Sequence, residues 1–188
     1  PLYVVAIGAP TNVASALLLA PEIAKHIVVV WLGSHPQAWP ANDEFNLRQD
    51  VAASQLLFDC GVPLVQIPCK NVAEHLRTTL PEMACHVRGR GAIGDYLYET
   101  YAGYYADHYA RSKVIWDISA IAYLNNPAWI PSEVRPAPVL NADLSWRPAP
   151  AGRHPFRVAT DVHRDLVFAD LFRNVALDAA LEDWWQQG

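Results

Sequence analysis

Three short runs of apolar, mostly β-branched residues occur in the first part of the chain, and helical patterns separate them. The runs are residues 2–8 (LYVVAIG), 27–32 (IVVVWL) and 62–68 (VPLVQIP). Runs that are apolar at every position are typical of strands buried on both faces of a sheet. Because strands that alternate with helices form parallel sheets through right-handed crossovers, the pattern predicts an α/β fold with an open, mostly parallel sheet.

Helical signals fill the segments between these strands. Residues 11–27 begin with Thr11 or Asn12 as a candidate cap and contain Pro21, so we expect a helix that breaks near the proline. Residues 47–61 have a helical pattern that ends at a glycine, which is the usual C-terminal signal. This alternation places the start of each connecting loop at the carboxyl edge of the sheet.

The second half of the chain is less regular. We expect a tyrosine-rich helix over 93–111, whose aromatic stripe is mostly core, and a second helix over 116–127 with Asp117 as its N-cap. The proline-rich segment 135–155 predicts edge strands joined by an exposed loop, and a strand followed by one or two helices should end the chain. Without an internal repeat or a long linker, residues 1–188 are predicted to form a single domain.

The charge and the cysteines of the chain exclude several classes of function. Lysine and arginine number 14 against 19 acidic residues, and there is no basic run, which argues against a nucleic-acid partner. The apolar runs are too short to span a bilayer and no secretory signal is recognisable, so we expect no membrane partner and a cytoplasmic location. Cys60, Cys69 and Cys85 show no metal-binding spacing and are expected to be reduced and mostly buried.

The segment 41–50 (ANDEFNLRQD) combines polar side chains with one phenylalanine at the start of a helix. Residues two apart in an extended segment point the same way, so Glu44 and Asn46 should face one space while Phe45 points into the core. A carboxylate beside an amide accepts from and donates to the hydroxyls of a sugar-like ligand. The alternative is an acidic loop that only caps the helix, with Asp43 or Asn46 as the N-cap.

Two loops leave predicted strands at the edge where such a ligand would bind. They are residues 8–12 and 33–46, and each follows one of the buried strands. In open α/β sheets, ligands bind beyond the carboxyl ends of the strands. The polar pair of residues 44 and 46 is therefore predicted to lie at the binding edge.

Three segments in this order resemble the nucleoside hydrolase family, the inosine-uridine preferring N-ribohydrolases. They are AIGAPTNVASALLLAPEIA, NDEFNLRQDVAASQLLFDCGVPL and VIWDISAIAYL, and the resemblance covers most of residues 2–124. The matching features are a G-x-x-T-N turn, a glutamate-phenylalanine-asparagine triplet and an aromatic residue followed by aspartate. Each feature is weak alone, but their joint order identifies the family.

The resemblance implies a Rossmann-like fold and an enzyme that hydrolyses the N-glycosidic bond of ribonucleosides, with water activated by calcium. It implies that Glu44 and Asn46 hold the ribose, and that Asp117 and the backbone carbonyl of Ile7 bind the calcium ion. Such an ion takes six to eight oxygen ligands. It also implies a homodimer or homotetramer.

Trp116 takes the place of a histidine that many members of the family use to protonate the departing base. Tryptophan there resembles the purine-preferring branch, so Trp116 is predicted to act in catalysis and in substrate binding by stacking on a purine. The alternative is that the indole only packs under the edge of the sheet. Tyr105, His108 and Tyr109 lie where the family has a mobile segment of the active site, and their role stays open.

The sequence departs from the family at its N-terminal aspartate cluster, of the form D-x-D-x-x-x-D-D, which does not occur in these residues. A ribose-binding asparagine expected before the triplet also has no clear match in residues 34–41. We therefore interpret the chain as the carboxyl-terminal part of a nucleoside hydrolase, which lacks the first strands of the sheet. The competing hypothesis is a non-catalytic, nucleoside- or sugar-binding or structural protein with a hydrolase-like fold.

Overall fold

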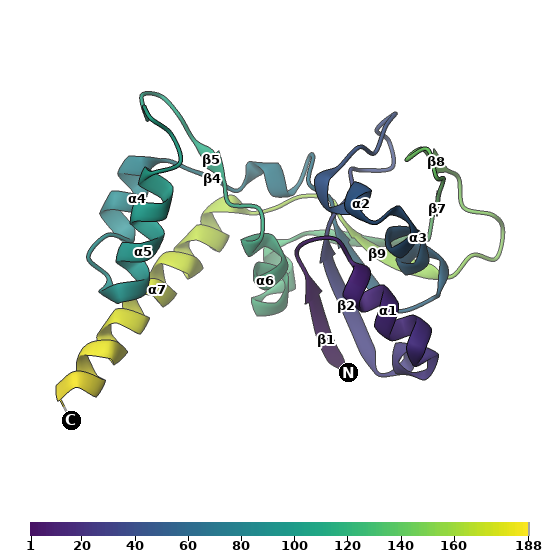
Figure 1. Ribbon diagram of the computed structural model, residues 1–188, viewed down its shortest axis with the longest axis horizontal. Helices are drawn as coiled ribbons and strands as arrows, with labels where there is room; N and C mark the ends of the chain where they lie inside the picture. Colours follow the sequence, from purple (N-terminus) through teal and green to yellow (C-terminus); the bar gives the residue numbers. More distant parts are fainter. Residues whose placement is uncertain (188) are drawn as a thin grey trace. The chain divides into compact units, whose positions relative to one another are not determined.

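The computed structural model describes the backbone of residues 1–187 and the side chains of residues 1–180. The chain forms two compact units, coloured along the sequence in Figure 1. The first unit contains Pro1–His75 and Trp116–Val162, and the second contains Leu76–Ile115 and the chain from His163 onward. That residues 1–188 act as a single domain stays a prediction.

The first unit is built on a five-stranded sheet in the order β1-β2-β3-β9-β6. Its strands are β1 (Leu2–Ala6), β2 (Ile27–Leu32), β3 (Leu64–Ile67), β9 (Pro155–Ala159) and β6 (Ser132–Pro136). The first four run parallel, whereas β6 pairs antiparallel with β9 at the edge. The predicted α/β fold with a mostly parallel sheet is confirmed.

Short helices and one small hairpin complete this unit (Figure 1). The helices are α1 (Thr11–Leu19), α2 (Phe45–Gln49), α3 (Val51–Asp59) and α6 (Ile118–Asn125), with single turns of 3-10 helix at Pro21–Lys25, Ala73–His75 and Pro127–Trp129. The hairpin pairs β7 (Val139–Leu140) with β8 (Trp146–Arg147). The sequence predicted the break after α1 near Pro21 correctly.

Aromatic side chains fill the core between the sheet and helices α1 and α3. Trp31 of β2 is fully buried, and its ring meets that of Phe58 edge-on at 6.0 Å between centroids. Phe58 also makes edge contacts with Phe156 of β9 at 5.9 Å and with Trp146 of β8 at 5.2 Å. These contacts link strands that are distant in sequence, and they fix the helices against one face of the sheet.

The helix expected over 47–61 is interrupted at Asp50, which ends α2 and begins α3. The Asp50 carboxylate accepts hydrogen bonds from the Thr11 hydroxyl at 2.6 Å and from the Ala53 backbone N–H at 2.9 Å. These two bonds lower the pKa of Asp50, the hydroxyl bond most strongly. The sequence suggested Thr11 as a cap of its own helix, but its hydroxyl instead joins α1 to the start of α3.

Strand β1 pairs with β2 on one side, and no other described strand pairs with its second edge. Side chains at this edge are apolar and exposed, with Leu2 67% and Tyr3 50% accessible. Leu18 and Leu19 of the neighbouring helix α1 are also exposed. Strands of parallel sheets are normally buried, so the exposed edge of β1 is as apolar as a surface that is usually covered.

The second unit packs three helices around a small core. They are α4 (Leu80–His86), α5 (Gly91–Ala102) and α7 (Arg164–Gln187), and the short strands β4 (Arg77–Thr78) and β5 (Lys113–Val114) pair beside them. Met83, Val87, Tyr101 and Val175 form the buried centre. The chain after the last strand is one continuous helix, which is one of the two arrangements the sequence allowed.

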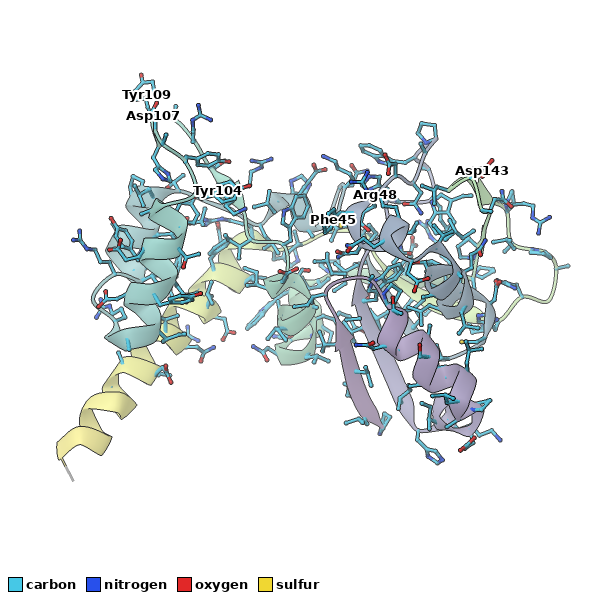
Figure 2. The ribbon with its side chains drawn as sticks, in the orientation of Figure 1. Phe45, Arg48, Tyr104, Asp107, Tyr109 and Asp143 are labelled. Carbon is cyan, nitrogen blue, oxygen red and sulfur yellow. The ribbon has the colours of Figure 1, made fainter. Side chains whose placement is uncertain are left out.

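The helix predicted over 93–111 is shorter than expected, because α5 ends at Ala102 and Gly103 follows as its C-cap. Tyr101 is buried, but Tyr104 lies beyond the helix and is 56% exposed. Figure 2 shows Tyr104, Asp107 and Tyr109 on the loop after α5. The prediction that the aromatic stripe is mostly core was therefore wrong, since the helical period does not continue past residue 102.

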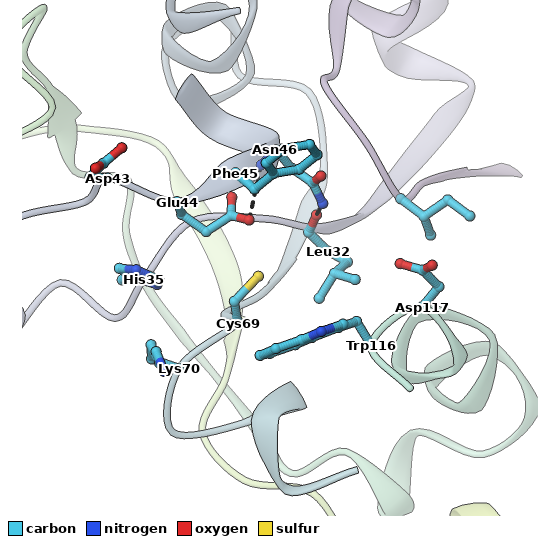
Figure 3. Close-up of a pocket in the computed structure, with 11 residues that line it drawn as sticks. Leu32, His35, Asp43, Glu44, Phe45, Asn46, Cys69, Lys70, Trp116 and Asp117 are labelled. Atoms are coloured by element: carbon cyan, nitrogen blue, oxygen red, sulfur yellow. Dashed lines mark hydrogen bonds between the residues drawn. The ribbon is translucent and has the colours of Figure 1, made fainter. Parts of the chain in front are cut away.

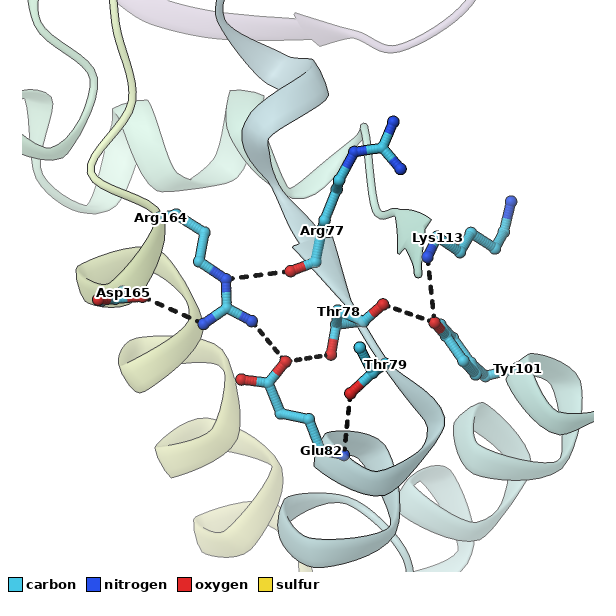
Figure 4. A network of polar contacts seen from close by, with 8 residues as sticks. All are labelled: Arg77, Thr78, Thr79, Glu82, Tyr101, Lys113, Arg164 and Asp165. Atoms are coloured by element: carbon cyan, nitrogen blue, oxygen red, sulfur yellow. Dashed lines mark hydrogen bonds and ion pairs between the residues drawn. The ribbon is translucent and has the colours of Figure 1, made fainter. Parts of the chain in front are cut away.

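Arg164 joins the start of α7 to β4 and α4 through the polar network in Figure 4. Its guanidinium donates to the Arg77 carbonyl at 3.0 Å and pairs with Glu82 and with Asp165. Glu82 in turn accepts from the Thr78 hydroxyl at 2.5 Å. A half-buried cation thus satisfies acceptors from three elements, and its loss leaves the Glu82 carboxylate with a single side-chain donor.

The structure corrects one expectation about the cysteines. All three are free thiols, but Cys60 and Cys85 are exposed and only Cys69 is buried. No helix in the described part of the chain is long and apolar enough to cross a membrane.

We predict that Arg164→Ala lowers the free energy of unfolding of the second unit by about 1–2 kcal/mol, because hydrogen bonds to charged groups are lost. Urea denaturation followed by circular dichroism measures this change. Arg173→Ala is the matched control, because this exposed arginine lies on the same helix. Equal stability of the two variants would show that the network does not hold α7 in place.

Candidate functional site

A cavity of about 550 Å³ opens at the carboxyl edge of the sheet in the first unit (Figure 3). Every site residue predicted from the sequence lines it: Ile7, Glu44, Asn46, Trp116 and Asp117. The other lining residues are Leu32, His35, Asp43, Phe45, Cys69 and Lys70. The lining residues lie at or just beyond the ends of β1, β2 and β3, at the start of α2 and just before α6, so the site is assembled where parallel sheets bind ligands.

Glu44 is held by backbone donors on the wall of this cavity. Its carboxylate accepts from the N–H groups of Ser34 at 2.8 Å, Asn46 at 2.9 Å and Leu47 at 2.9 Å. The side chain is 5% exposed and is the N-cap of α2. The expectation that Asp43 or Asn46 caps this helix was wrong, because the capping carboxylate belongs to Glu44.

Asn46 lines the cavity together with Glu44, as predicted, whereas Phe45 does not point in the predicted direction. Asn46 is only 8% exposed, and its side-chain N–H donates to the Leu32 carbonyl at 2.9 Å. Phe45 was expected in the core but is 64% exposed, and the Arg48 guanidinium lies over its ring (Figure 2). The reason is that α2 begins at Phe45, so helical spacing turns Leu47 inward and leaves the aromatic ring outside.

Residues of the loop after β2 hold the Glu44 carboxylate in place, and the sequence analysis did not identify them. Ser34 has a left-handed backbone with φ of 68°, which aims its N–H at the Glu44 carboxylate. The Gln66 amide contacts the Ser34 hydroxyl, and the His35 N–H donates to the Asn42 side chain at 2.5 Å. A serine after the glycine that directly follows β2 was the available signal, but such a dipeptide is common in loops.

Cys69 and Lys70 follow β3 and line the same cavity. Burial raises the pKa of the Cys69 thiol, and the neighbouring Glu44 carboxylate raises it further. The thiol is therefore protonated and unsuited to act as a nucleophile. Lys70 forms an ion pair with Glu74 at 3.1 Å, so its charge is partly compensated. Burial lowers the pKa of His35, although Glu44 opposes this effect.

Trp116 and Asp117 stand at the start of α6. Figure 3 shows the indole of Trp116 along one side of the cavity, with Asp117 across from His35 and Lys70. Asp117 occupies the N-cap position of α6, as predicted, but its side chain makes no capping hydrogen bond to the helix. Its carboxylate is exposed and lines the cavity.

The oxygen ligands present in the cavity do not fit a calcium ion. Asp117 and the carbonyl of Ile7 are two potential ligands, whereas calcium takes six to eight oxygens. The Glu44 carboxylate is already engaged by backbone N–H groups. Within the described residues there is no group of three or more histidine, cysteine, aspartate or glutamate side chains that could hold a metal ion.

Tyr105, His108 and Tyr109 belong to the second unit. The His108 ring packs against Tyr101 at 5.8 Å and meets Tyr105 at 5.5 Å between centroids, and its Nε2 lies 2.9 Å from the Ala102 carbonyl. These contacts are internal to the second unit. Tyr109 is 85% exposed.

Comparison with known proteins gives one sequence relative and several structural ones. The chain is 29% identical over 134 residues to a probable uridine nucleosidase 2 of Arabidopsis thaliana, a match that covers 69% of this chain. The plant nucleoside hydrolase PpNRh1 superposes with a TM-score of 0.76 at 23% identity, over 93% of this chain. A purine-preferring ribonucleoside hydrolase from Gardnerella vaginalis gives a TM-score of 0.74 at 21% identity, over 96% of this chain.

The chain spans only part of these relatives. It covers 39% of the length of the Arabidopsis protein, 61% of the plant structure and 62% of the Gardnerella structure. The structural likenesses show a common fold, whereas the family follows from sequence. The family model of the inosine-uridine preferring nucleoside hydrolases matches residues 1–169, and the chain therefore belongs to this family.

Proposed function

We propose that the protein hydrolyses the N-glycosidic bond of ribonucleosides and releases ribose and the free base. The observation that carries this proposal is that one cavity brings together Glu44, Asn46 and Trp116 with Asp117 and Ile7. The family assignment supports the same reaction. A ribose-release assay of the natural protein with inosine, guanosine and uridine tests the proposal, and the absence of hydrolysis of all three would contradict it.

The charge of the cavity suits the transition state of this reaction. Three acidic residues, Asp43, Glu44 and Asp117, line it against one lysine, Lys70, which pairs with Glu74. Glycosidic cleavage places positive charge on the sugar ring. Glu44 cannot turn away, because three backbone N–H groups hold its carboxylate. A fixed negative charge beside the ribose stabilises the developing cation without reorganisation.

Asn46 and Trp116 would position the two halves of the nucleoside. The Asn46 amide is fixed by its bond to the Leu32 carbonyl, which leaves its oxygen to accept from a ribose hydroxyl. Trp116 offers an indole face for stacking on the base, a contact worth about 1–3 kcal/mol. Since a purine presents the larger face, we propose a preference for purine ribosides.

Calcium enters the proposal only through the family resemblance. When bound, such an ion would supply Lewis-acid activation of water. The residues present do not complete its ligand shell, so no step is assigned to it here. A cytoplasmic location and a homo-oligomer, which were expected from the sequence, are likewise part of the proposal.

The second candidate function is a non-catalytic nucleoside- or sugar-binding protein. The lack of a three-ligand metal group among the described residues favours it for residues 1–188 alone. The two functions differ in turnover, because the binding protein would retain ribonucleosides without releasing ribose.

We predict that residues 1–188 alone bind calcium weakly, with a dissociation constant above about 1 mM, because one carboxylate and one carbonyl are too few ligands. Isothermal titration calorimetry of the metal-free chain checks this value. Asp117→Asn should change little, since there is little binding to lose. Micromolar affinity that Asp117→Asn abolishes would show that the ligand set is larger than Asp117 and Ile7.

We predict that Asn46→Ala lowers turnover of purine ribosides by about tenfold, because a hydroxyl contact that strengthens in the transition state is lost. Because Asn46 is buried, the variant should also lose about 1–2 kcal/mol of stability. Steady-state kinetics below the melting temperature separates the two effects. Gln49→Ala on the same helix is the control, because Gln49 is exposed and its side chain bonds the Phe45 carbonyl of its own helix. Equal activity of both variants would assign Asn46 a purely structural role.

We predict that Trp116→Ala reduces cleavage of inosine and guanosine far more than any residual cleavage of uridine. Tryptophan cannot act as an acid near neutral pH, so base departure must be helped by stacking, and a purine gains more from it. Parallel values of kcat/KM for the three substrates measure the effect. Trp116→Phe should keep most of the preference. If both variants lose all substrates equally, the indole serves packing.

A further inference from the structure

A second cavity of about 380 Å³ lies in the first unit, apart from the candidate active site. It is formed between the loop that follows β2 and the segment from the end of β6 to just beyond β8. None of its lining residues is acidic, although the protein has a net charge of −5. The contrast with the carboxylate-lined active site indicates a different class of ligand.

The polar side chains around this second cavity carry mainly hydrogen-bond donors. Arg135 and Arg147 contribute guanidinium groups, and both residues are exposed. Arg135 pairs with Glu133, whereas the Arg147 guanidinium has no hydrogen-bond or ion-pair partner among the described side chains. A guanidinium presents a planar fork that matches the oxygens of a carboxylate or phosphate.

Two further donors in the lining residues have no partner. The indole Nε1 of Trp146 and the amide Nε2 of Gln37 are both buried without a hydrogen bond in the described structure. Buried donors are normally satisfied, so each such exception calls for a missing acceptor. The terminal torsion of a glutamine is soft, so a small rotation would turn the Gln37 amide toward a ligand.

The remaining walls are apolar and stiff. Pro136, Pro138 and Pro148 line the cavity, and none of them has a backbone N–H. The Trp146 ring is held in place by its edge contact with Phe58 at 5.2 Å. Such walls suit the carbon skeleton of a small molecule rather than a hydrated inorganic ion alone.

We propose that this second cavity binds a small organic anion, whose phosphate or carboxylate oxygens accept from Arg147, Trp146 and Gln37. The site is placed to affect the active site, because Gln37 lies on the loop that also carries His35 and Glu44. This loop is internally bonded, as the His35 N–H donates to Asn42 and the Ser34 N–H to Glu44. The proposal does not depend on which reaction the active site performs.

The test is a titration of ¹⁵N-labelled residues 1–188 with ribose 5-phosphate, inorganic phosphate and citrate at constant ionic strength. The indole N–H resonance of Trp146 is the readout, and it is identified by its absence in Trp146→Phe. We expect a saturable shift of this resonance with at least one anion and none with uncharged ribose. A response to the phosphates alone identifies a phosphate ligand, and a response to citrate alone identifies a carboxylate.

Arg147→Gln should weaken the binding by about tenfold or more, because a charge-assisted hydrogen bond is lost. Arg173→Gln is the matched control, because Arg173 is exposed and is not among the residues that line this cavity. The proposal is overturned if no anion shifts the Trp146 resonance saturably. It is also overturned if ribose shifts the resonance equally, or if the two arginine variants weaken binding to the same extent.

Discussion

The candidate site depends on one buried carboxylate. Glu44 ends the loop after β2, begins helix α2 and accepts from three backbone N–H groups on both sides of the turn. A carboxylate with 5% exposure is stable only because these donors replace its hydration. Its position in turn fixes Asn46 in the wall of the cavity and leaves the Phe45 ring outside. The structural and the proposed functional role of Glu44 therefore rest on the same set of hydrogen bonds.

Much of the first unit could be predicted from the sequence, because its signals are local. Apolar runs identified β1, β2 and β3, and the family motifs identified five residues that the fold brings to one cavity. Parallel strands explain this success, since they place the following loops at a common edge. The same reasoning did not identify Ser34 or Cys69, whose positions depend on backbone geometry and on contacts that no sequence motif shows.

Two predicted helices had wrong boundaries, because hydrophobic spacing alone does not show where a helix ends. Asp50 divides a continuous helical pattern because its carboxylate accepts from Thr11, 39 positions earlier in the chain. The aromatic pattern beyond Tyr101 looked helical, but Gly103 ends α5 and leaves Tyr104 on a loop. In the first case a tertiary contact interrupts the periodic pattern, and in the second a C-terminal cap ends it. Helix boundaries are therefore the part of the fold that hydrophobic spacing predicts least well.

The open edge of β1 has a practical consequence for work with this polypeptide. The strand has no charged residue, proline or bulge, which are the features that keep exposed edges of natural sheets from pairing with other molecules. The backbone edge that no described strand pairs with, together with the exposed leucine and tyrosine side chains, forms a template for intermolecular strand addition. Residues 1–188 should therefore aggregate as their concentration rises. A lysine in place of Tyr3 should reduce this aggregation by placing a charge on the open edge.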